Sequence, residues 1–272
     1  MDINRKVALV TGAGSGIGRA TAIRLAREGA SVVAADVNED GGRETVGMIE
    51  GSGGRATFVR VDVTKVDDAR NMVSFAEETF DGLDILHNNA GIGSGQPAYP
   101  MGDPERWQEV LDVNLRGVIL GTQYAIPAMQ KRGGGAIVNT ASLAGVAAGY
   151  ALDPVYSASK GGVVMFTASL APLGAEINIR VNCVCPGVVE TPMLRAPRDG
   201  RTEEEQRALE ELLRRIAILQ PEDIADAVIA LIQDESASGQ AMWVYNGKPR
   251  ELHPLLDALS MARLIMGREA RR

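Results

Sequence analysis

Tyr156 and Lys160 form the first pair of residues whose types and spacing point to chemistry. They follow Asp153 and Pro154, which favour the N-cap and the first position of a helix, so both side chains fall on one helical face. A phenol held beside an ammonium group can take up or return a proton. An isolated Tyr-x-x-x-Lys is nevertheless typical of a solvated helix face, so its companions decide the interpretation.

Three further polar features accompany this pair. Ser142 comes after a predicted strand, and an Asn-Asn-Ala-Gly sequence at residues 88–91 closes another strand. Asn114 lies inside a long predicted helix. Ligands of open α/β folds bind at the carboxyl ends of the strands. We therefore expect all three features to lie at or near that edge of the sheet.

A glycine cluster at residues 11–18, Thr-Gly-Ala-Gly-Ser-Gly-Ile-Gly, lies between a predicted strand and a predicted helix. Glycines there let the backbone approach a pyrophosphate, which binds the free N–H groups at the helix start. The spacing is T-G-x-x-x-G-x-G rather than G-x-G-x-x-G, and alone it also fits a glycine-rich turn. Asp36 ends the next strand about 20 residues beyond Gly16, where a carboxylate can bind ribose hydroxyls. An Asp at a strand end is often only solvated, but the two features together predict a dinucleotide site.

The elements that must position these residues alternate between short apolar strands and helical patterns. Strands are predicted at residues 7–10, 31–36, 56–61, 83–88, 136–139 and 180–184. Helices are predicted at residues 18–28, 40–50, 66–80, 103–131 and 154–175. This alternation indicates βαβ units, and right-handed crossovers place helices on both faces of a parallel sheet. The predicted fold is therefore α/β, a doubly wound parallel sheet (Rossmann-like), with residues 1–250 forming a single catalytic domain.

The pattern becomes looser after Pro186. The further elements are a loop at 187–200, a charged amphipathic helix at 201–218, a helix at 221–233, a short strand at 241–245 and a helical tail within 251–272. The helical pattern of the tail begins at Pro254. We expect residues 187–218 to cover a substrate site, because late insertions above such a sheet often do.

Composition narrows the possible partners. The 272 residues are 45% hydrophobic and 23% charged, a globular balance, and 28 basic against 35 acidic residues give a net charge of −7. That charge argues against general affinity for nucleic acid or an anionic membrane face. The longest uncharged stretch, residues 133–152, reads as strand and loop, so no membrane span is predicted. Only Cys183 and Cys185 are present, which excludes a disulfide framework and fits a reducing, cytoplasmic location.

With these motifs together, the sequence resembles the short-chain dehydrogenase/reductase family over residues 6–247. The resemblance implies that the family's catalytic residues are Asn114, Ser142, Tyr156 and Lys160. It also implies dinucleotide contacts at Gly12, Ser15, Gly16, Ile17, Gly18, Asp36, Asp62, Val63, Asn89, Ala90, Gly91, Tyr156, Lys160, Pro186, Gly187, Val189 and Thr191. At residues 244–247 the chain reads Val-Tyr-Asn-Gly where many members have Val-Asp-Gly-Gly, which leaves subunit contacts and the substrate rim open.

Such an enzyme transfers a hydride between an alcohol carbon and nicotinamide, which requires a group that takes or returns the hydroxyl proton. Tyr156 can do so if its pKa falls from about 10 toward about 7, which corresponds to about 4 kcal/mol. An ammonium at roughly 5 Å supplies about 3 kcal/mol, so we expect Lys160 to provide most of the shift and oxidised nicotinamide the remainder. Ser142 would hold the substrate oxygen, and Asn114 would tie a water to the lysine.

The sequence favours NAD over NADP as the cofactor. NADP carries an extra phosphate on the adenosine ribose, which the Asp36 carboxylate would repel. Family members that prefer NADP usually have a basic residue where this chain has Ser15 or Val37. Arg19 follows the glycine motif inside a helix and is interpreted as a helix-surface residue.

The expected substrate is an uncharged, fairly hydrophobic secondary alcohol or ketone. The segments expected to border its pocket, 92–99, 143–152 and 188–197, are mainly apolar or small. Arg195 or Arg198 could instead hold a carboxylate, so a substrate that bears a carboxylate stays an alternative. The resemblance also implies a homotetramer, or else a homodimer, in which the long helices pair.

Other functions fit the residues less well. A serine hydrolase needs a base near its serine, but only His87 and His253 exist and no G-x-S-x-G elbow is present. No metal site is predicted, because the histidines are far apart in sequence and the cysteines lie in a predicted core strand. Both histidines are interpreted as structural or solvated. A dinucleotide-binding sensor or scaffold without turnover stays open, although intact Ser142, Tyr156 and Lys160 argue against it.

Overall fold

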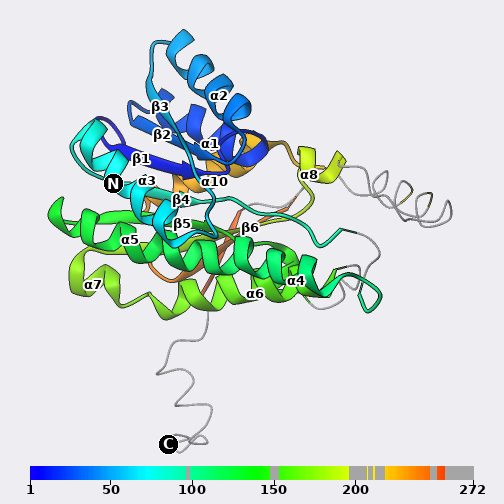
Figure 1. The fold of residues 1–272 in the computed structure, drawn as a ribbon. Coiled ribbons are helices and arrows are strands. Elements are labelled where there is room, and N and C mark those ends of the chain that lie inside the picture. The colour runs from blue at the N-terminus through cyan, green and yellow to red at the C-terminus, as the bar shows by residue number, and fades with distance from the viewer. Residues whose placement is uncertain are drawn as a thin grey trace, which may run out of the picture.

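A sheet of eight strands runs through the middle of the protein (Figure 1). The computed structural model describes residues 1–95, 99–147, 153–195, 207, 211, 218–245 and 250–254. The strands are β1 (Val7–Thr11), β2 (Ser31–Asp36), β3 (Arg55–Arg60), β4 (Ile85–Asn88), β5 (Gly135–Thr140), β6 (Ile179–Pro186), β7 (Gln240–Val244) and β8 (Glu251–Pro254). Their order across the sheet is β3-β2-β1-β4-β5-β6-β7-β8. Neighbouring strands are parallel except for β7 and β8, which are antiparallel.

Helices cover both faces of this sheet. They are α1 (Gly16–Arg27), α2 (Glu39–Gly51), α3 (Val66–Phe80), α4 (Pro104–Leu111), α5 (Gly117–Lys131), α6 (Pro154–Ser169), α7 (Leu173–Ile177), α8 (Pro192–Arg195) and α10 (Pro221–Gln233). A π-helical turn, η1 (Asp112–Arg116), joins α4 to α5, and a 3-10 turn, η2 (Leu143–Gly145), follows β5. Buried side chains of α1, α2 and α10 pack in one core cluster, and those of α3, α5 and α6 pack on the opposite face.

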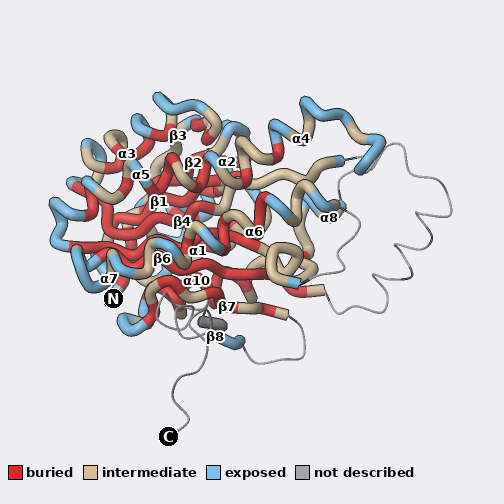
Figure 2. Tube along the Cα trace, turned by 90° about the horizontal axis from the view of Figure 1, so that it is seen from below, coloured by how far each residue is buried: buried red, intermediate tan, exposed pale blue. Residues whose placement is uncertain are grey.

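The central strands form where the sequence is continuously apolar, because both faces of a parallel sheet are covered by helices. Every residue of β1, β5 and β6 is buried, and Figure 2 shows β1 and β6 in the buried interior, with more exposed helices around them. Successive side chains of a strand point to opposite faces. In β5, Val138 accordingly packs in the cluster with α1 and α10, whereas Ile137 packs in the cluster with α3 and α5.

The predicted fold class is confirmed. The chain is a single α/β domain with a doubly wound, mostly parallel sheet, and β2, α3 and α10 have the predicted bounds residue for residue. The strand order leaves β1 and β4 adjacent at the centre, where the crossovers change direction. Open α/β sheets bind ligands at this point, outside the carboxyl ends of the strands.

Two of the predicted helices are interrupted in the structure. The helix predicted over 103–131 is divided by the π-helical turn η1, which apolar periodicity does not reveal. The helix predicted over 154–175 ends at Ser169, and α7 begins only after Pro172. Proline has no backbone N–H to donate and its ring blocks the preceding helical turn, which explains this break.

The tail predicted over residues 251–272 begins with a strand, because residues 251–254 form β8 and pair with β7. The predicted helical pattern begins at Pro254, which is the last residue of β8. The remainder of the tail, residues 255–272, lies outside the described residues. The charged helix predicted over 201–218 also lies mostly outside them, although Arg207 and Glu211 are helical.

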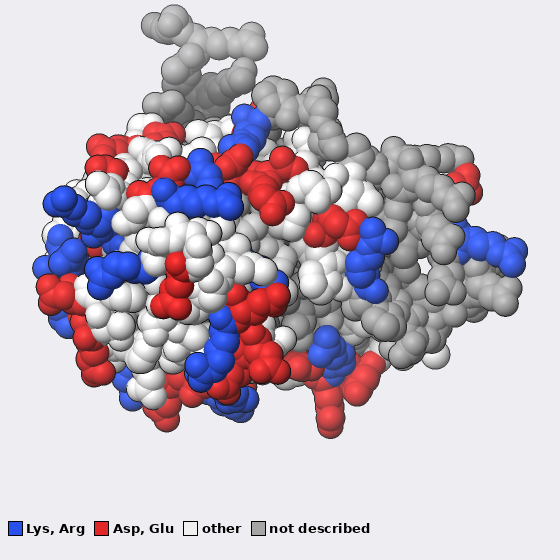
Figure 3. Space-filling view, turned by 90° about the horizontal axis from the view of Figure 1, so that it is seen from above, with Lys and Arg blue, Asp and Glu red and all other residues white. Residues whose placement is uncertain are grey.

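Charged side chains of both signs are interspersed on the face seen in Figure 3. Arg24 contacts both Glu28 and Asp226, and Arg43 contacts Glu39 within one helix. Such exposed pairs contribute about 0–1 kcal/mol each, so they shape the surface potential more than the stability. Among the helices that the structure describes, none combines the length and apolarity needed to cross a membrane.

Candidate active site

The predicted site residues converge on the carboxyl edge of the four central strands. Thr11 ends β1, the segment 88–91 follows β4, and Ser142 follows β5. The strands β1, β4, β5 and β6 are consecutive neighbours in the sheet, so their ends lie side by side. α6 runs alongside and brings Tyr156 and Lys160 to the same edge. The sequence prediction for this convergence is confirmed.

The glycine cluster forms a tight turn that leads directly into α1. Gly12 has a φ of +65°, which side-chain-bearing residues rarely adopt. A Cβ atom on Gly18 would lie 2.0 Å from the Gly12 carbonyl oxygen, so only glycine fits there. The N-cap residue Ser15 makes no side-chain cap bond, and the first turn of α1 holds no acidic residue. The backbone N–H groups of this first turn, together with the positive end of the helix dipole, fit a pyrophosphate.

Thr11 connects the glycine turn to the segment after β4. Its hydroxyl accepts the backbone N–H groups of Asn89 (3.0 Å) and Ala90 (3.2 Å). The Asn89 amide donates in turn to the Thr11 carbonyl at 3.1 Å. Asn89 and Ala90 therefore brace the turn from the next strand, which agrees with their predicted place beside the dinucleotide. The sequence motif includes Thr11 but does not predict that its hydroxyl braces the turn, because the partners of this hydroxyl come from a distant segment.

Asp36 faces the glycine turn from the end of β2. One carboxylate oxygen accepts the Gly14 N–H at 2.7 Å and the other accepts the Asn38 N–H at 2.8 Å, which fixes the side chain in place. Arg19 lies close by but is already engaged, with bonds to the Gly14 carbonyl (2.6 Å) and to Glu44 (2.5 Å). Arg19 is partly exposed on α1, which agrees with its interpretation as a helix-surface residue, and its guanidinium also joins α1 to α2.

The remaining predicted cofactor residues lie in the same region, at or after the ends of strands or in the first turn of α1. The side chain of Asp62 accepts the Thr64 N–H at 3.0 Å, and Val63 is buried against Gly117. Ile17 lies in the first turn of α1, and Pro186 ends β6. The Gly187 N–H donates to the Val244 carbonyl at 2.8 Å, and Val189 forms a β-bridge with Leu219.

Thr191 connects the two ends of the predicted dinucleotide site. Its methyl carbon lies 3.1 Å from the position that a Cβ atom on Gly16 would occupy. The segment predicted to bind the nicotinamide end therefore folds back onto the predicted phosphate turn. This contact places the start of α1 beside the loop that follows β6.

The catalytic set predicted from the resemblance is brought together around α6. The Lys160 ammonium lies 5.8 Å from the centre of the Tyr156 ring and donates to the Thr140 carbonyl at 2.8 Å. The Ser142 hydroxyl accepts the Ala144 N–H at 3.1 Å and lies near enough to the Tyr156 phenol to lower its pKa. A hydroxyl, a phenol and an ammonium thus meet within one small region. They can bind a carbonyl or alcohol oxygen and move a proton to or from it.

Asn114 is buried in the π-helical turn η1, beside the lysine. Its side-chain oxygen accepts the Ile92 N–H at 2.8 Å, and its amide donates to the Ile92 carbonyl at 2.9 Å and to Ser159 at 3.1 Å. π-helical turns occur often at functional sites because the extra residue redirects a side chain. Here the turn holds Asn114 against the segment that follows β4.

Burial dominates the proton affinities of the catalytic pair. Desolvation lowers the pKa of Lys160 to about 8, so its amine is still mostly protonated at neutral pH. Desolvation raises the pKa of Tyr156 to about 12, while the Ser142 hydrogen bond acts in the opposite direction. The expectation that Lys160 would bring the pKa of Tyr156 toward 7 is therefore not met in the chain alone. The ammonium lies 5.8 Å from the ring centre and donates to the Thr140 carbonyl, and Lys160 is not among the causes that shift the pKa of Tyr156.

His87 is structural rather than solvated. It is completely buried in β4, and its Nε2 lies 2.9 Å from the Thr140 hydroxyl. Because that hydroxyl donates to Asn89, we assign Nε2 as the donor, and Nδ1 has no partner among the described residues. Burial, with a contribution from the Lys160 charge, lowers the pKa of His87 to about 3. The imidazole therefore stays neutral and supports the residue that holds the lysine.

We predict that His87 makes the fold sensitive to acid. Between pH 6.5 and about 3 the unfolded chain protonates this imidazole but the folded chain does not, so stability falls as the pH falls through this range. In His87→Gln, the loss of unfolding free energy between about pH 6.5 and 5 should be smaller by up to about 1.4 kcal/mol per pH unit. Urea unfolding across this range measures the slope, and equal slopes in both proteins would contradict the assignment.

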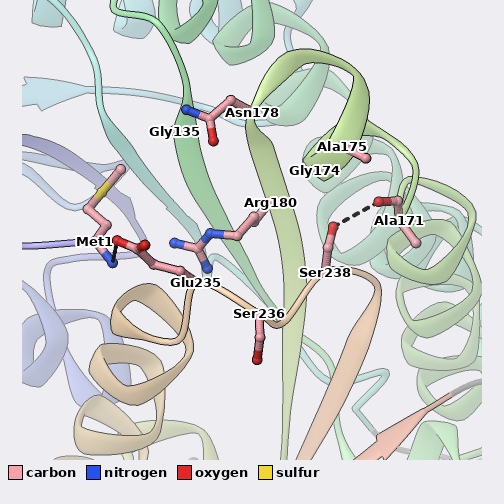
Figure 4. Close-up of a pocket in the computed structure, with 10 residues that line it drawn as sticks. All are labelled: Met1, Gly135, Ala171, Gly174, Ala175, Asn178, Arg180, Glu235, Ser236 and Ser238. Carbon is pink, nitrogen blue, oxygen red and sulfur yellow. Dashed lines mark hydrogen bonds and ion pairs between the residues drawn. The ribbon is translucent and has the colours of Figure 1, made fainter.

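A cavity of about 510 Å³ lies at the opposite edge of the sheet, near the starts of β5, β6 and β7 (Figure 4). Its central side chain, Arg180, donates to the carbonyls of Leu231 (3.0 Å), Ile232 (2.6 Å) and Asp234 (2.6 Å). These bonds cap the C-terminal end of α10. The polar groups of this cavity therefore serve the fold, and the chemistry lies at the other edge.

Comparison with known proteins decides the family. The profile described as short chain dehydrogenase matches residues 6–202. The chain belongs to this family. A cyclohexanol dehydrogenase from Acinetobacter sp. (strain SE19) is 38% identical over 234 residues, which cover 86% of this chain and 90% of the relative. A cyclopentanol dehydrogenase from Comamonas testosteroni is 40% identical over 235 residues, which cover 86% of this chain and 92% of the relative.

The solved structures include a close match in fold. The crystal structure of levodione reductase superimposes on this chain with a TM-score of 0.83 at 30% sequence identity. The match covers 90% of this chain and 97% of the levodione reductase chain. This short-chain dehydrogenase is therefore an oxidoreductase by family, with relatives named for cyclic secondary alcohols. Members of the family use nicotinamide dinucleotides, and the tight glycine turn at the start of α1 suits the pyrophosphate of such a cofactor.

Proposed function

We propose that the protein interconverts an uncharged, hydrophobic secondary alcohol and its ketone with NAD(H), and that the substrate is cyclic. The observation that carries this proposal is the meeting of Ser142, Tyr156 and Lys160 at the carboxyl edge of the sheet, beside the glycine turn. When bound, the dinucleotide supplies the hydride acceptor or donor and, in its oxidised form, a positive charge that favours the phenolate.

The proton belongs to Tyr156 in this proposal. With its pKa raised by burial, the phenol is protonated at neutral pH in the chain alone, which suits donation to a ketone oxygen. Ser142 bonds the same oxygen and fixes its distance from the phenol. Lys160, held by Thr140, contributes positive charge on the side of the ring away from the substrate and stabilises the phenolate during alcohol oxidation. Asn114 would tie a water to the lysine and open a route for the proton.

Asp36 supports the choice of NAD. Its carboxylate is fixed by Gly14 and Asn38, so it cannot easily turn away from a phosphate on the adenosine ribose. The nearest described basic side chain to this turn, Arg19, has its donors engaged with Gly14, Thr45 and Glu44. It is therefore poorly placed to neutralise that phosphate.

The substrate side supports an uncharged molecule. Ile92, Leu143 and Val146 are apolar and only partly exposed near the site. Arg195 is a candidate to bind a substrate carboxylate, but its guanidinium pairs with both oxygens of Glu190 at 2.5 and 2.7 Å. The second arginine, Arg198, lies outside the described residues, as do parts of the expected pocket borders. The named substrates of the relatives, cyclohexanol and cyclopentanol, belong to the proposed class.

Subunit pairing is also part of the proposal. Several large apolar side chains are exposed on the described surface, including Met101 at 77% and Met165 at 59%. Met165 lies on α6, within the long helical region expected to pair between subunits. We therefore propose that the protein is a homotetramer, or else a homodimer, and light scattering that finds a monomer would contradict this proposal. We also propose a reducing, cytoplasmic location.

A spectrophotometric panel tests the proposed activity. With NAD⁺, cyclic secondary alcohols should give NADH absorbance at 340 nm. Their kcat/KM should be at least about tenfold above that for small hydroxy acids, because Arg195 is already paired with Glu190 and does not offer a free cation to a substrate carboxylate. If carboxylate-bearing alcohols prove the best substrates, the substrate proposal is wrong. If no alcohol is oxidised although NAD binds tightly, the protein is a sensor or scaffold with this fold.

A further inference from the structure

The segment that follows Gly91 is held at three successive residues by side chains from three different helical elements. Asn114 of η1 bonds both backbone groups of Ile92 at 2.8 and 2.9 Å. Arg106 of α4 donates to the Gly93 carbonyl at 2.9 Å. The third contact comes from Asp153, which precedes α6 and bonds Ser94. A segment fixed this closely cannot shift without moving the helices around it.

Asp153 joins this segment to the helix of the catalytic pair. One carboxylate oxygen accepts the Ser94 N–H at 3.0 Å, and the other accepts the Ser94 hydroxyl at 2.6 Å. The second oxygen also accepts the backbone N–H of Tyr156 at 3.0 Å. A single side chain therefore fixes both the segment and the first turn of α6.

A helix cap does not require the contact with Ser94. α4 begins with the same Asp-Pro pair, and Asp103 caps it by accepting the Glu105 N–H at 2.9 Å. Within the described residues, Asp103 makes no bond to another segment. Asp153 shares the capping function but adds two bonds to a residue 59 positions away. The additional bonds are what distinguish the helix that carries Tyr156.

The start of the same segment contacts Lys160. A Cβ atom on Gly91 would lie 3.4 Å from the Lys160 nitrogen and 3.3 Å from the Asn114 side-chain oxygen, so the backbone passes close to both groups. Three residues later, Ser94 is bound to the turn that holds Tyr156. The segment therefore spans the catalytic pair, with the lysine at one end and the tyrosine at the other.

We propose that Asp153 is a positioning residue that locks Tyr156 to the wall formed by residues 92–94, so that a substrate seated on this wall meets the phenol at a fixed distance. The inference rests on the proposed function and assigns part of the precision of the reaction to one pair of residues, Asp153 and Ser94. A displacement of about 1 Å can cost about 10²-fold in rate. Loss of the link should therefore affect turnover more than binding.

Two substitutions weaken the link while preserving the cap. Ser94→Ala deletes the hydroxyl that Asp153 accepts but keeps the backbone N–H bond, and Asp153→Ser retains a good N-cap residue but lacks the second carboxylate oxygen. Each should reduce kcat about tenfold while KM changes by less than about threefold, because the pair positions Tyr156 and does not bind the substrate. The double variant should lose no more of its kcat than the more impaired single variant, because both substitutions weaken the same link. Asp103→Ser, the same change at the matched cap of α4, should leave kcat unchanged.

Stability and exchange measurements separate positioning from a general loss of structure. The melting temperature of Ser94→Ala should fall by at most about 4 °C, and the affinity for NAD should stay within about twofold. In Asp153→Ser, hydrogen exchange of a peptide covering residues 91–95 should be faster than in the wild type. If the melting temperature falls but kcat at low temperature is unchanged, the role is merely structural and the inference is overturned. Additive losses in the double variant, or unchanged exchange, would also overturn it.

The exchange measurement does not depend on catalysis. If the wild-type protein oxidises no alcohol, the proposed function fails and the exchange result alone decides whether the link holds the segment. If the wild type is active and both variants match it, the inference fails while the proposed function stands.

Discussion

Tyr156→Phe should reduce kcat by about 10²- to 10⁴-fold, the usual contribution of a general acid or base. The substitution removes the hydroxyl near Ser142 and retains the ring beside Lys160. Affinity for the dinucleotide should change little, because the glycine turn and Asp36 are held by contacts of their own. Initial rates with saturating cyclohexanol and NAD⁺ measure the first effect, and fluorescence titration measures the second.

Tyr124→Phe provides the matched control. Tyr124 lies on α5, packs with the α3 and α5 core and has the Arg70 guanidinium 5.5 Å from its ring, away from the proposed chemistry. The same loss of one hydroxyl there should leave kcat within about twofold. Near-normal turnover in Tyr156→Phe would show that another group carries the proton.

The cofactor preference should be equally clear. We expect kcat/KM for NAD to exceed that for NADP by at least about 10²-fold, or about 2.7 kcal/mol, because Asp36 would face the added phosphate. Asp36→Ala should reduce the ratio at least about tenfold, since the repulsion is removed. Absolute efficiency with NAD should also fall, because the Gly14 N–H loses its acceptor.

A second acidic substitution controls for net charge. Asp67 is 80% exposed on α3 and pairs only with Arg70 among the described residues, so Asp67→Ala changes the overall charge equally without touching the groove. The NAD/NADP ratio should be unchanged in this variant. Equal efficiency of the two cofactors in the wild type, or an unchanged ratio in Asp36→Ala, would show that Asp36 is not the selector.

The strands and most helices were predictable because their signals are local. Continuous apolar runs ending in Gly or Asp define β1 and β2, and Asp-Pro pairs announce α4 and α6. The glycine turn and Asp36 were predictable for the same reason, since their spacing is fixed by one βαβ unit. The fold class follows from these signals without any long-range information.

The parts that the sequence did not show depend on contacts between distant segments. The π-helical turn at Asn114 leaves the apolar period almost unchanged, and β8 forms only because β7 presents an edge. Arg19 and Thr140 gain their roles from carbonyl groups and side chains that other strands and helices supply. The pKa of Tyr156 depends on how far the phenol is desolvated, which the spacing of Tyr and Lys does not reveal.

The central claim is hydride transfer from the carbinol carbon of a cyclic alcohol to nicotinamide, and one isotope measurement tests it directly. The protein is incubated with NAD⁺ and cyclohexanol that carries deuterium at the carbinol carbon, and the nucleotide product is analysed by mass spectrometry. The account predicts that the NADH formed carries the deuterium and that Tyr156→Phe forms it at least about 10²-fold more slowly. NADH without deuterium, or no NADH from any cyclic alcohol by a protein that binds NAD, would contradict the account.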